Sequence, residues 1–238
     1  MSYLGAKSQA GVWQRIINQM PPHEFYIEPF FGSGQIFFRK RPAVRNVIID
    51  ADAGVIARFN AARRRTAPDS TLWTANAICG DAVRELAALK PTLPAATVIY
   101  CDPPYLHSTR SSRHRYHHEM TDEQHAAFLA LVQELPGHIL ISGYPSKLYA
   151  DKLRDWRCIS YRVRTRGQTK TECLWCNFPE PEELHDWRFI GNSYRERLTL
   201  KRFAGRFLTR LDAMPALKRN FILHLVHHRH GRCDRIKK

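Results

Sequence analysis

Four consecutive residues in the middle of the chain carry the groups needed to bind a planar amine. The segment Asp102-Pro103-Pro104-Tyr105 follows an apolar run, Thr97–Cys101, which is typical of a buried strand. The two prolines fix the backbone and remove two N–H donors, so the Asp102 carboxylate and the Pro103 carbonyl are free to accept hydrogen bonds. Tyr105 offers a flat face on which a base can stack. Because ligands of open α/β sheets bind at the carboxyl ends of strands, this segment predicts a site for the exocyclic amine of a nucleobase.

A second segment, Glu28–Gly34 (EPFFGSG), has the features of a turn that approaches a ligand. Its glycines let the backbone come close to a bound group, and the residues after it can present N–H groups. The next apolar run, Asn46–Asp50, ends in a carboxylate that can accept hydrogen bonds from a ribose diol. The spacing is not G-x-G-x-x-G, which disfavours a dinucleotide site. The alternative interpretation is a tight turn and a surface carboxylate.

The elements around these motifs alternate between strands and helices, which favours a mainly parallel sheet covered on both faces. The expected strands are Phe25–Glu28, Asn46–Asp50, Ala77–Gly80, Thr97–Cys101, His138–Ser142, Cys158–Arg164 and Thr171–Phe178. The expected helices are Trp13–Met20, Gln35–Arg41, Gly54–Arg64, Asp81–Leu89, Asp122–Leu135, Lys147–Leu153, Tyr194–Leu211 and Ala216–Val226. A break at Pro179–Glu183 predicts one domain over residues 1–180 and a basic helical extension over 181–238.

Charge indicates a polyanionic partner. The 238 residues include 37 Lys and Arg but 22 Asp and Glu, a net charge of +15. Residues 185–238 alone hold 14 of these cations and 4 of the anions. An excess of this size favours nucleic acid, although a basic packing appendage is the alternative for the C-terminal helices.

Other classes of protein fit the sequence less well. No apolar run reaches the ~20 residues of a membrane span, and the N-terminus lacks the pattern of a secretory signal, so we expect a cytoplasmic protein. The six cysteines read as reduced thiols. The pair Cys173 and Cys176 lies in an extended segment, and the histidines near the C-terminus lack a second Cys pair, so we expect no metal site.

The order of the motifs resembles that of the D12-class, Dam-like DNA adenine-N6 methyltransferases, from Tyr3 to about Phe178. The similar elements are Tyr3–Lys7 with W-x-G-G-K, Glu28–Gly34 with E-P-F-x-G-x-G, Asp50 with the acid of D-I-N, Gly80-Asp81 with the segment beside the cofactor adenine, and Asp102–Tyr105 with D-P-P-Y. Tyr3 and Ala6 depart from the first pattern, where the family has Trp and Gly. Residues 116–125 and 141–144 are similar to phage and prophage members in particular.

The resemblance implies a Rossmann-like fold and methyl transfer from S-adenosylmethionine to N6 of an adenine flipped out of duplex DNA, with no metal and no obligatory protein partner. The implied cofactor-binding residues are Tyr3, Lys7, Glu28, Phe30, Gly32, Gly34, Asp50, Asp81 and Asp102. The implied catalytic residues are Asp102, Pro103, Pro104 and Tyr105. Asp102 and the Pro103 carbonyl would accept hydrogen bonds from N6, and Tyr105 would stack on the base.

One departure from the family concerns the reading of DNA. Only 19 residues separate Asp81 from Cys101, which leaves no room for the usual recognition insertion. We therefore expect DNA contacts from shorter basic elements, with Arg110, Arg113, Arg115, Arg166 and Lys170 as the candidate residues. The alternative for residues 106–120 is a solvated loop.

Two other functions share these residues. An RNA adenine-N6 methyltransferase can carry a similar tetrad, and the charge does not separate DNA from RNA. A DNA-binding protein that keeps the fold without catalysis is the second alternative. A cytosine-C5 enzyme is excluded, because none of the six cysteines follows a proline.

Overall fold

We describe the protein from a computed structural model. The structure describes residues 7, 9, 11–65, 75–109, 118–165 and 168–230. They divide into two compact units, Met1–Phe189 and Ile190–Lys238, which we treat separately.

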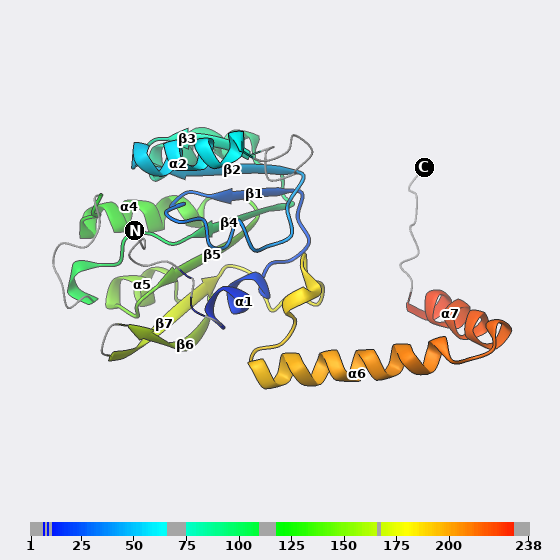
Figure 1. The fold of residues 1–238 in the computed structure, drawn as a ribbon. Coiled ribbons are helices and arrows are strands. Elements are labelled where there is room, and N and C mark those ends of the chain that lie inside the picture. The colour runs from blue at the N-terminus through cyan, green and yellow to red at the C-terminus, as the bar shows by residue number, and fades with distance from the viewer. Residues whose placement is uncertain are drawn as a thin grey trace. The chain divides into compact units, whose positions relative to one another are not determined.

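The first unit is built on a seven-stranded sheet in the order β3-β2-β1-β4-β5-β7-β6. The strands are β1 (Phe25–Glu28), β2 (Arg45–Asp50), β3 (Ala75–Cys79), β4 (Thr97–Cys101), β5 (His138–Gly143), β6 (Arg157–Thr165) and β7 (Gln168–Cys176). The first five strands are parallel, and β7 pairs antiparallel with both β5 and β6. This arrangement confirms the predicted Rossmann-like α/β fold with a mainly parallel sheet (Figure 1).

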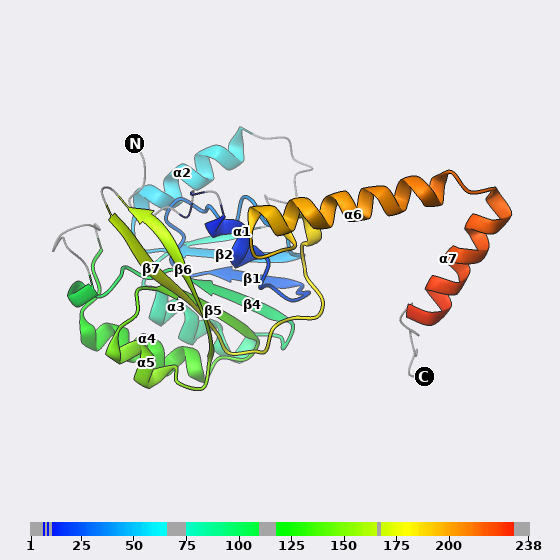
Figure 2. The same ribbon diagram turned by 90° about the horizontal axis from the view of Figure 1, so that it is seen from below.

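Helices cover both faces of this sheet (Figure 2). Helices α1 (Val12–Ile17) and α2 (Ala53–Arg64) pack on one face. Helices α3 (Ala82–Leu89), α4 (Asp122–Gln133) and α5 (Lys147–Lys152) pack on the other. The strands alternate between the two cores: in β4, Val98 and Tyr100 face the first, whereas Ile99 and Cys101 face the second. Both faces are buried, which is why these strands read as continuous apolar runs.

The segment after β1 differs from the prediction. The sequence predicts a helix over Gln35–Arg41, but these residues form only hydrogen-bonded turns, among them Phe38 N to Gly34 O at 2.9 Å. The side chains of Phe31 and Phe37 instead pack edge-on against Phe59 of α2, and the Phe38 ring lies tilted beside it. Packing of this aromatic cluster, together with Pro42 just beyond it, overrides the local helical preference.

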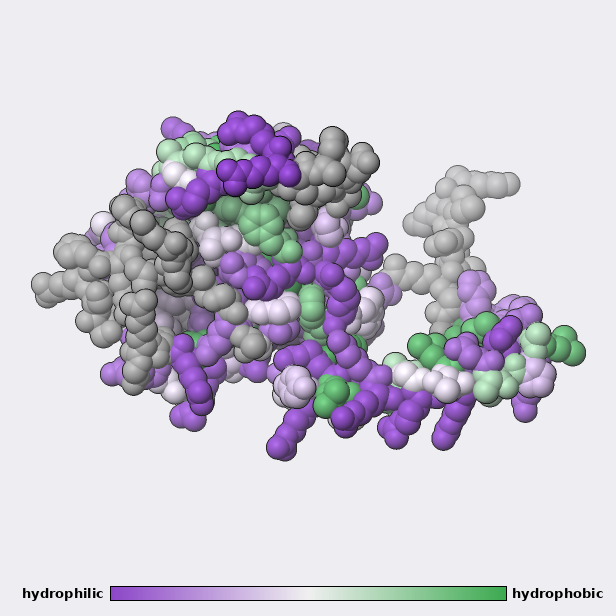
Figure 3. Space-filling view, in the orientation of Figure 1, coloured by the Kyte–Doolittle hydropathy of each residue, from purple (hydrophilic) through white to green (hydrophobic). Residues whose placement is uncertain are grey.

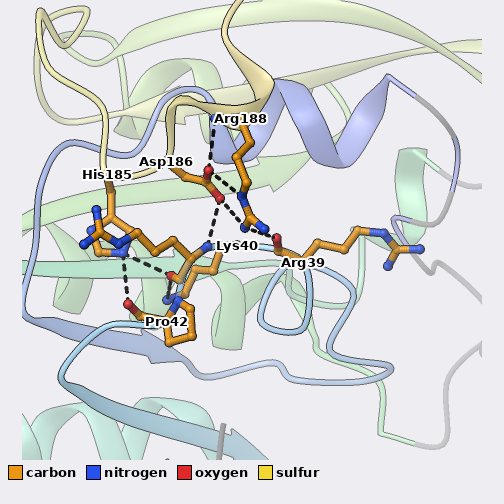
Figure 4. A network of polar contacts seen from close by, with 7 residues as sticks. Arg39, Lys40, Pro42, His185, Asp186 and Arg188 are labelled. Carbon is orange, nitrogen blue, oxygen red and sulfur yellow. Dashed lines mark hydrogen bonds and ion pairs between the residues drawn. The ribbon is translucent and has the colours of Figure 1, made fainter. Parts of the chain in front are cut away.

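The chain leaves the first unit later than residue 180, where the sequence predicts the boundary. Figure 4 shows His185, Asp186 and Arg188 in contact with the turn that follows β1. Asp186 accepts a hydrogen bond from the Arg41 amide at 2.9 Å and pairs with Arg188 at 2.7 Å. His185 lies 3.0 Å from the Arg41 carbonyl. In the division of the chain into two units, residues 181–189 therefore belong to the first unit.

The second unit contains two helices, α6 (Tyr194–Asp212) and α7 (Ala216–His230). Ser193 caps α6, since its hydroxyl accepts from the Glu196 amide at 3.1 Å. Figure 3 shows hydrophilic side chains along α6 and a larger share of hydrophobic ones on α7. Among the described residues, no helix has the length and hydropathy to cross a bilayer.

Candidate active site

A cavity of about 400 Å³ opens at the carboxyl ends of β1, β2, β3 and β4. The strand order reverses between β1 and β4, which is the position where open α/β sheets bind ligands. The wall of the cavity carries six carboxyl side chains and one ammonium group: Glu28, Asp50, Asp52, Asp81, Asp102, Glu119 and Lys7. In a chain of net charge +15, this local excess of carboxylates indicates a cationic ligand.

Asp102, Pro103, Pro104 and Tyr105 all line this cavity, directly after β4. The Asp102 carboxylate is largely buried, with 19% of its side chain exposed. Its Oδ1 atom lies 2.8 Å from the Lys7 ammonium and 3.2 Å from the Tyr105 hydroxyl oxygen. The structure thus brings the two ends of the predicted site together, 95 residues apart in sequence.

The charges around Asp102 set its protonation. Burial raises the pKa of Asp102, Lys7 lowers it, and the nearby Glu172 raises it again. Burial also acts to lower the pKa of Lys7, but the carboxylates of Asp102 and Glu172 outweigh it and hold that pKa above its ordinary value. Lys7 is therefore a permanent cation in this cluster.

Glu28, at the end of β1, is a second buried carboxyl group in the cavity wall. Burial, opposed by a 2.8 Å hydrogen bond from the Tyr26 hydroxyl and reinforced by Asp102, raises its pKa to about 8. At neutral pH, Glu28 is accordingly mostly protonated, and it can both donate and accept.

Asp50, at the end of β2, holds the glycine turn in place. Its Oδ2 atom accepts from the Gly32 amide at 2.7 Å, and Oδ1 accepts from the Asp52 amide at 2.8 Å. Burial raises the pKa of Asp50, and these two amides oppose that rise. Each carboxylate oxygen has a further lone pair, so Asp50 can still accept hydrogen bonds from a diol that enters the cavity.

The remaining predicted residues of this group fall into two sets. Phe30, Gly32 and Asp81 line the cavity, and Asp81 also caps α3 by accepting from the Arg84 amide at 2.9 Å. Gly34 is not part of the wall. It has φ +63° and leaves room for the Phe31 ring, so its contribution is to the shape of the turn.

Several predicted residues lie outside the described part of the chain: Tyr3, Arg110, Arg113, Arg115 and Arg166. Lys170 is described, and it contacts Tyr144 and Thr109. Its ammonium is 4.9 Å from the ring of Tyr144 and donates to the Thr109 carbonyl at 3.4 Å. The Tyr144 ring in turn packs edge-on against Tyr105 at 4.5 Å.

Two residues of this site escape the motif-based prediction. Glu172 on β7 is buried and contacts both Lys7 and Tyr105. Tyr144, directly after β5, packs edge-on against the Tyr105 ring. The sequence does hold one signal for Glu172, which is an acidic residue at the start of the apolar run of a strand. Because a buried acid requires a partner, this pattern indicates a nearby cation or donor.

The C-x-x-C pair does not converge on one site. Cys173 packs in the core on one face of the sheet and Cys176 in the core on the other, because residues three apart on a strand point to opposite faces. Within the described ranges, no group of three His, Cys, Asp or Glu side chains is arranged to hold a metal ion.

Comparison with known proteins relates the sequence to one family. Residues 79–156 match the profile of the D12 class N6 adenine-specific DNA methyltransferases. This segment runs from the end of β3 past the D-P-P-Y tetrad to the residue before β6, and the match confirms the predicted resemblance. No match is found among curated proteins.

Solved structures with a similar arrangement share little sequence with the chain. A precorrin-8w decarboxylase from Methanobacterium thermoautotrophicum is 12% identical, with a TM-score of 0.49 over 74% of this chain and 94% of that one. A SAM-dependent methyltransferase from Agrobacterium tumefaciens is 13% identical, with a TM-score of 0.43 over 69% and 58%. A putative methylase from Haemophilus influenzae is 16% identical, with a TM-score of 0.43 over 75% and 92%. At these TM-scores the likenesses carry no functional argument, and the assignment of the fold depends on the strand order itself.

Proposed function

We propose that the protein transfers a methyl group from S-adenosylmethionine to the N6 amino group of adenine in double-stranded DNA. The observation that carries this proposal is the position of Asp102–Tyr105 in the wall of the acidic cavity, at the point where the strand order reverses. The match of residues 79–156 to a family of DNA adenine methyltransferases supports the same reaction.

The chemistry of the cavity wall fits this cofactor. S-adenosylmethionine carries a sulfonium and an ammonium group, and the wall offers carboxylates at the ends of four strands. We expect Asp50 to accept hydrogen bonds from the ribose and Phe30 to pack against the adenine ring, with Asp81 at the adenine end. The volume of about 400 Å³ lies in the range of small-molecule sites.

The residues of the tetrad have separate tasks in this reaction. The Asp102 carboxylate accepts a hydrogen bond from the adenine amine and orients its lone pair, and the Pro103 carbonyl is the second acceptor. The Tyr105 ring stacks on the base, which must leave the duplex to reach a buried site. When bound, S-adenosylmethionine supplies the methyl group from a positively charged sulfur. The N6–C bond would form as the S–C bond breaks and the thioether S-adenosylhomocysteine leaves, and the Asp102 carboxylate would accept the proton that N6 loses. Positioning and electrostatics therefore account for the catalysis.

We assign the DNA contacts to basic side chains on two elements. Lys170 lies beside Tyr144, which packs on Tyr105, and from there we expect it to meet a phosphate next to the flipped base. On α6, Arg202, Arg206 and Arg210 are exposed and spaced four residues apart, which places them on one face of the helix. A row of arginines of this kind matches the charge of a DNA backbone.

The proposal is tested by methyl transfer from labelled S-adenosylmethionine to unmethylated duplex DNA, with nucleoside analysis of the product. We expect N6-methyladenine with the wild-type protein and none with Asp102→Ala, which should retain salt-sensitive DNA binding. Asp155→Ala, a change at an exposed residue on the surface, is the matched control and should be fully active. Methylation of RNA alone would favour an RNA methyltransferase. Absence of cofactor binding would leave a non-catalytic nucleic-acid-binding protein.

A further inference from the structure

Lys7 bridges two carboxylates at the base of the cavity. Its ammonium lies 2.8 Å from Asp102 Oδ1 and 2.5 Å from Glu172 Oε1. Both side chains are nearly enclosed, with 8% of the Lys7 side chain and 4% of the Glu172 side chain exposed. Two ionised carboxylates and one ammonium leave an excess negative charge in a buried place, which is costly unless a cation arrives to balance it.

Glu172 also holds Tyr105. The Tyr105 hydroxyl donates to Glu172 and accepts from Lys7, and the Tyr105 ring is 8% exposed. The hydroxyl of the tetrad tyrosine is thus anchored from β7. This anchor fixes the ring that would stack on the base.

We propose that Glu172 is a positioning residue: by sharing the Lys7 ammonium with Asp102, it keeps Asp102 a strong hydrogen-bond acceptor for the adenine amine. This inference rests on the proposed function. If Glu172 were neutral, Lys7 would pair with Asp102 alone and would weaken the Asp102 carboxylate as an acceptor. Glu172 therefore acts on the reaction through Lys7 and Tyr105, without itself touching the base.

The groups that face Asp102 determine how its protonation responds to a change at position 172. The charged or ionisable side chains around it are Lys7, Glu28, Tyr100, Cys101, Tyr105, Tyr149, Tyr161 and Glu172. Of these, Lys7 lowers the pKa of Asp102, whereas the negative charge of Glu172 raises it. Removal of the charge of Glu172 should therefore lower the pKa of Asp102.

The test is Glu172→Gln, which keeps the shape of the side chain and removes its charge. We expect kcat to fall on the order of 10-fold or more, with KM for S-adenosylmethionine within about threefold of wild type. In a plot of kcat against pH, the acid limb of Glu172→Gln should lie at lower pH than that of wild type. Glu172→Asp keeps the charge, so it should leave that limb in place and lower kcat less. Glu134→Gln, at an exposed ion pair with Lys90, is the matched control and should change none of these quantities.

A second readout does not depend on turnover. In protein labelled with carbon-13 at the aspartate carboxyls and free of cofactor, the Asp102 signal, assigned by its loss in Asp102→Asn, should titrate at lower pH in Glu172→Gln. A purely structural role for Glu172 would lower thermal stability and leave both titrations where they are, and that result would overturn the inference. If Glu172→Gln does not fold, Glu172→Met, which also removes the charge, carries the test: an Asp102 titration moved to lower pH supports the inference, and an unmoved one refutes it. Wild-type protein that methylates no adenine would refute the proposed function instead, and the carboxyl titration would still test the charge coupling.

Discussion

The amide of Gly32 donates a 2.7 Å hydrogen bond to Oδ2 of Asp50, and this bond ties the turn after β1 to the end of β2. A carboxylate that the sequence suggests for a ribose is therefore also a structural part of the glycine turn. The other oxygen of Asp50 accepts from the Asp52 amide at 2.8 Å and so fixes the approach to α2. Since one side chain shapes two segments of the cavity wall, the cofactor site and the fold are coupled at this point.

Asp50→Ala should weaken cofactor binding more than Asp50→Asn does. The alanine variant loses every acceptor for the ribose and frees the Gly32 amide, whereas asparagine retains one oxygen. We expect the Kd for S-adenosylmethionine, measured by titration calorimetry, to rise about 10-fold or more in Asp50→Ala, since a hydrogen bond to a charged group contributes roughly 1.5–3 kcal/mol. Asp151→Ala, at an exposed ion pair on α5, is the control. Wild-type affinity in Asp50→Ala would contradict a ribose contact.

Gly34→Ala should destabilise the first unit. A Cβ at position 34 would collide with the ring of Phe31, and the backbone there has φ +63°, which favours glycine. We expect the free energy of unfolding in urea to fall by roughly 1–3 kcal/mol. Gly205→Ala in α6 is the contrasting control, because no atom lies within 4 Å of the new Cβ and alanine favours helix. It should leave this transition unchanged and increase helical content. Equal free energies of unfolding in the two variants would refute the requirement for glycine at position 34.

Stability should fall with rising pH because of Glu28. In the folded protein, burial and Asp102 raise the pKa of Glu28 to about 8, from an ordinary value of 4.5. Between these two values the folded state binds more protons than the unfolded state, so the free energy of unfolding declines as pH rises through this window. Glu28→Gln keeps an acceptor for the Tyr26 hydroxyl and cannot ionise. We measure the free energy of unfolding in urea from pH 5 to pH 8. Between these pH values it should decline less in Glu28→Gln than in wild type, by about 1 kcal/mol or more.

The control for this prediction is Glu24→Gln, four residues earlier and exposed. It should show the same pH dependence as wild type. The same slope in Glu28→Gln as in wild type would show that Glu28 ionises normally in the folded protein.

Much of the site follows from the sequence because strand ends are easy to recognise. The apolar run Asn46–Asp50 ends in a carboxylate, and Thr97–Cys101 is followed directly by Asp102. Parallel strands bring such ends to one edge of the sheet. Glu172 is different, because its partner Lys7 is 165 residues away and only the antiparallel pairing of β7 with β5 brings them together. The expected helix over Gln35–Arg41 failed for a related reason, since contacts with Phe59 of α2 outweigh the local preference. Local residue patterns do not reveal contacts between residues that are far apart in the sequence.

Neutralisation of the arginine face of α6 should weaken DNA binding and make it less sensitive to salt. Arg206 and Arg210 are exposed and lie one turn apart on this face. Each phosphate contact contributes about 0.9 to the slope of log K against log salt concentration. If both arginines meet phosphates, the double change to Gln should lower the magnitude of that slope by roughly 1–2. The slope is measured by fluorescence anisotropy with a labelled duplex over a series of salt concentrations.

Arg64 and Arg65, at the end of α2, provide a control with the same loss of total charge. Their double change to Gln should leave the slope close to wild type, because we assign no DNA contact to that end of α2. A specific role for α6 predicts a clear difference between the two double variants. An equal, small effect of both would mean that only net charge matters and that α6 does not contact DNA. Methyl transfer by the α6 variant at low salt should stay near wild type, since none of the residues around Asp102 is changed.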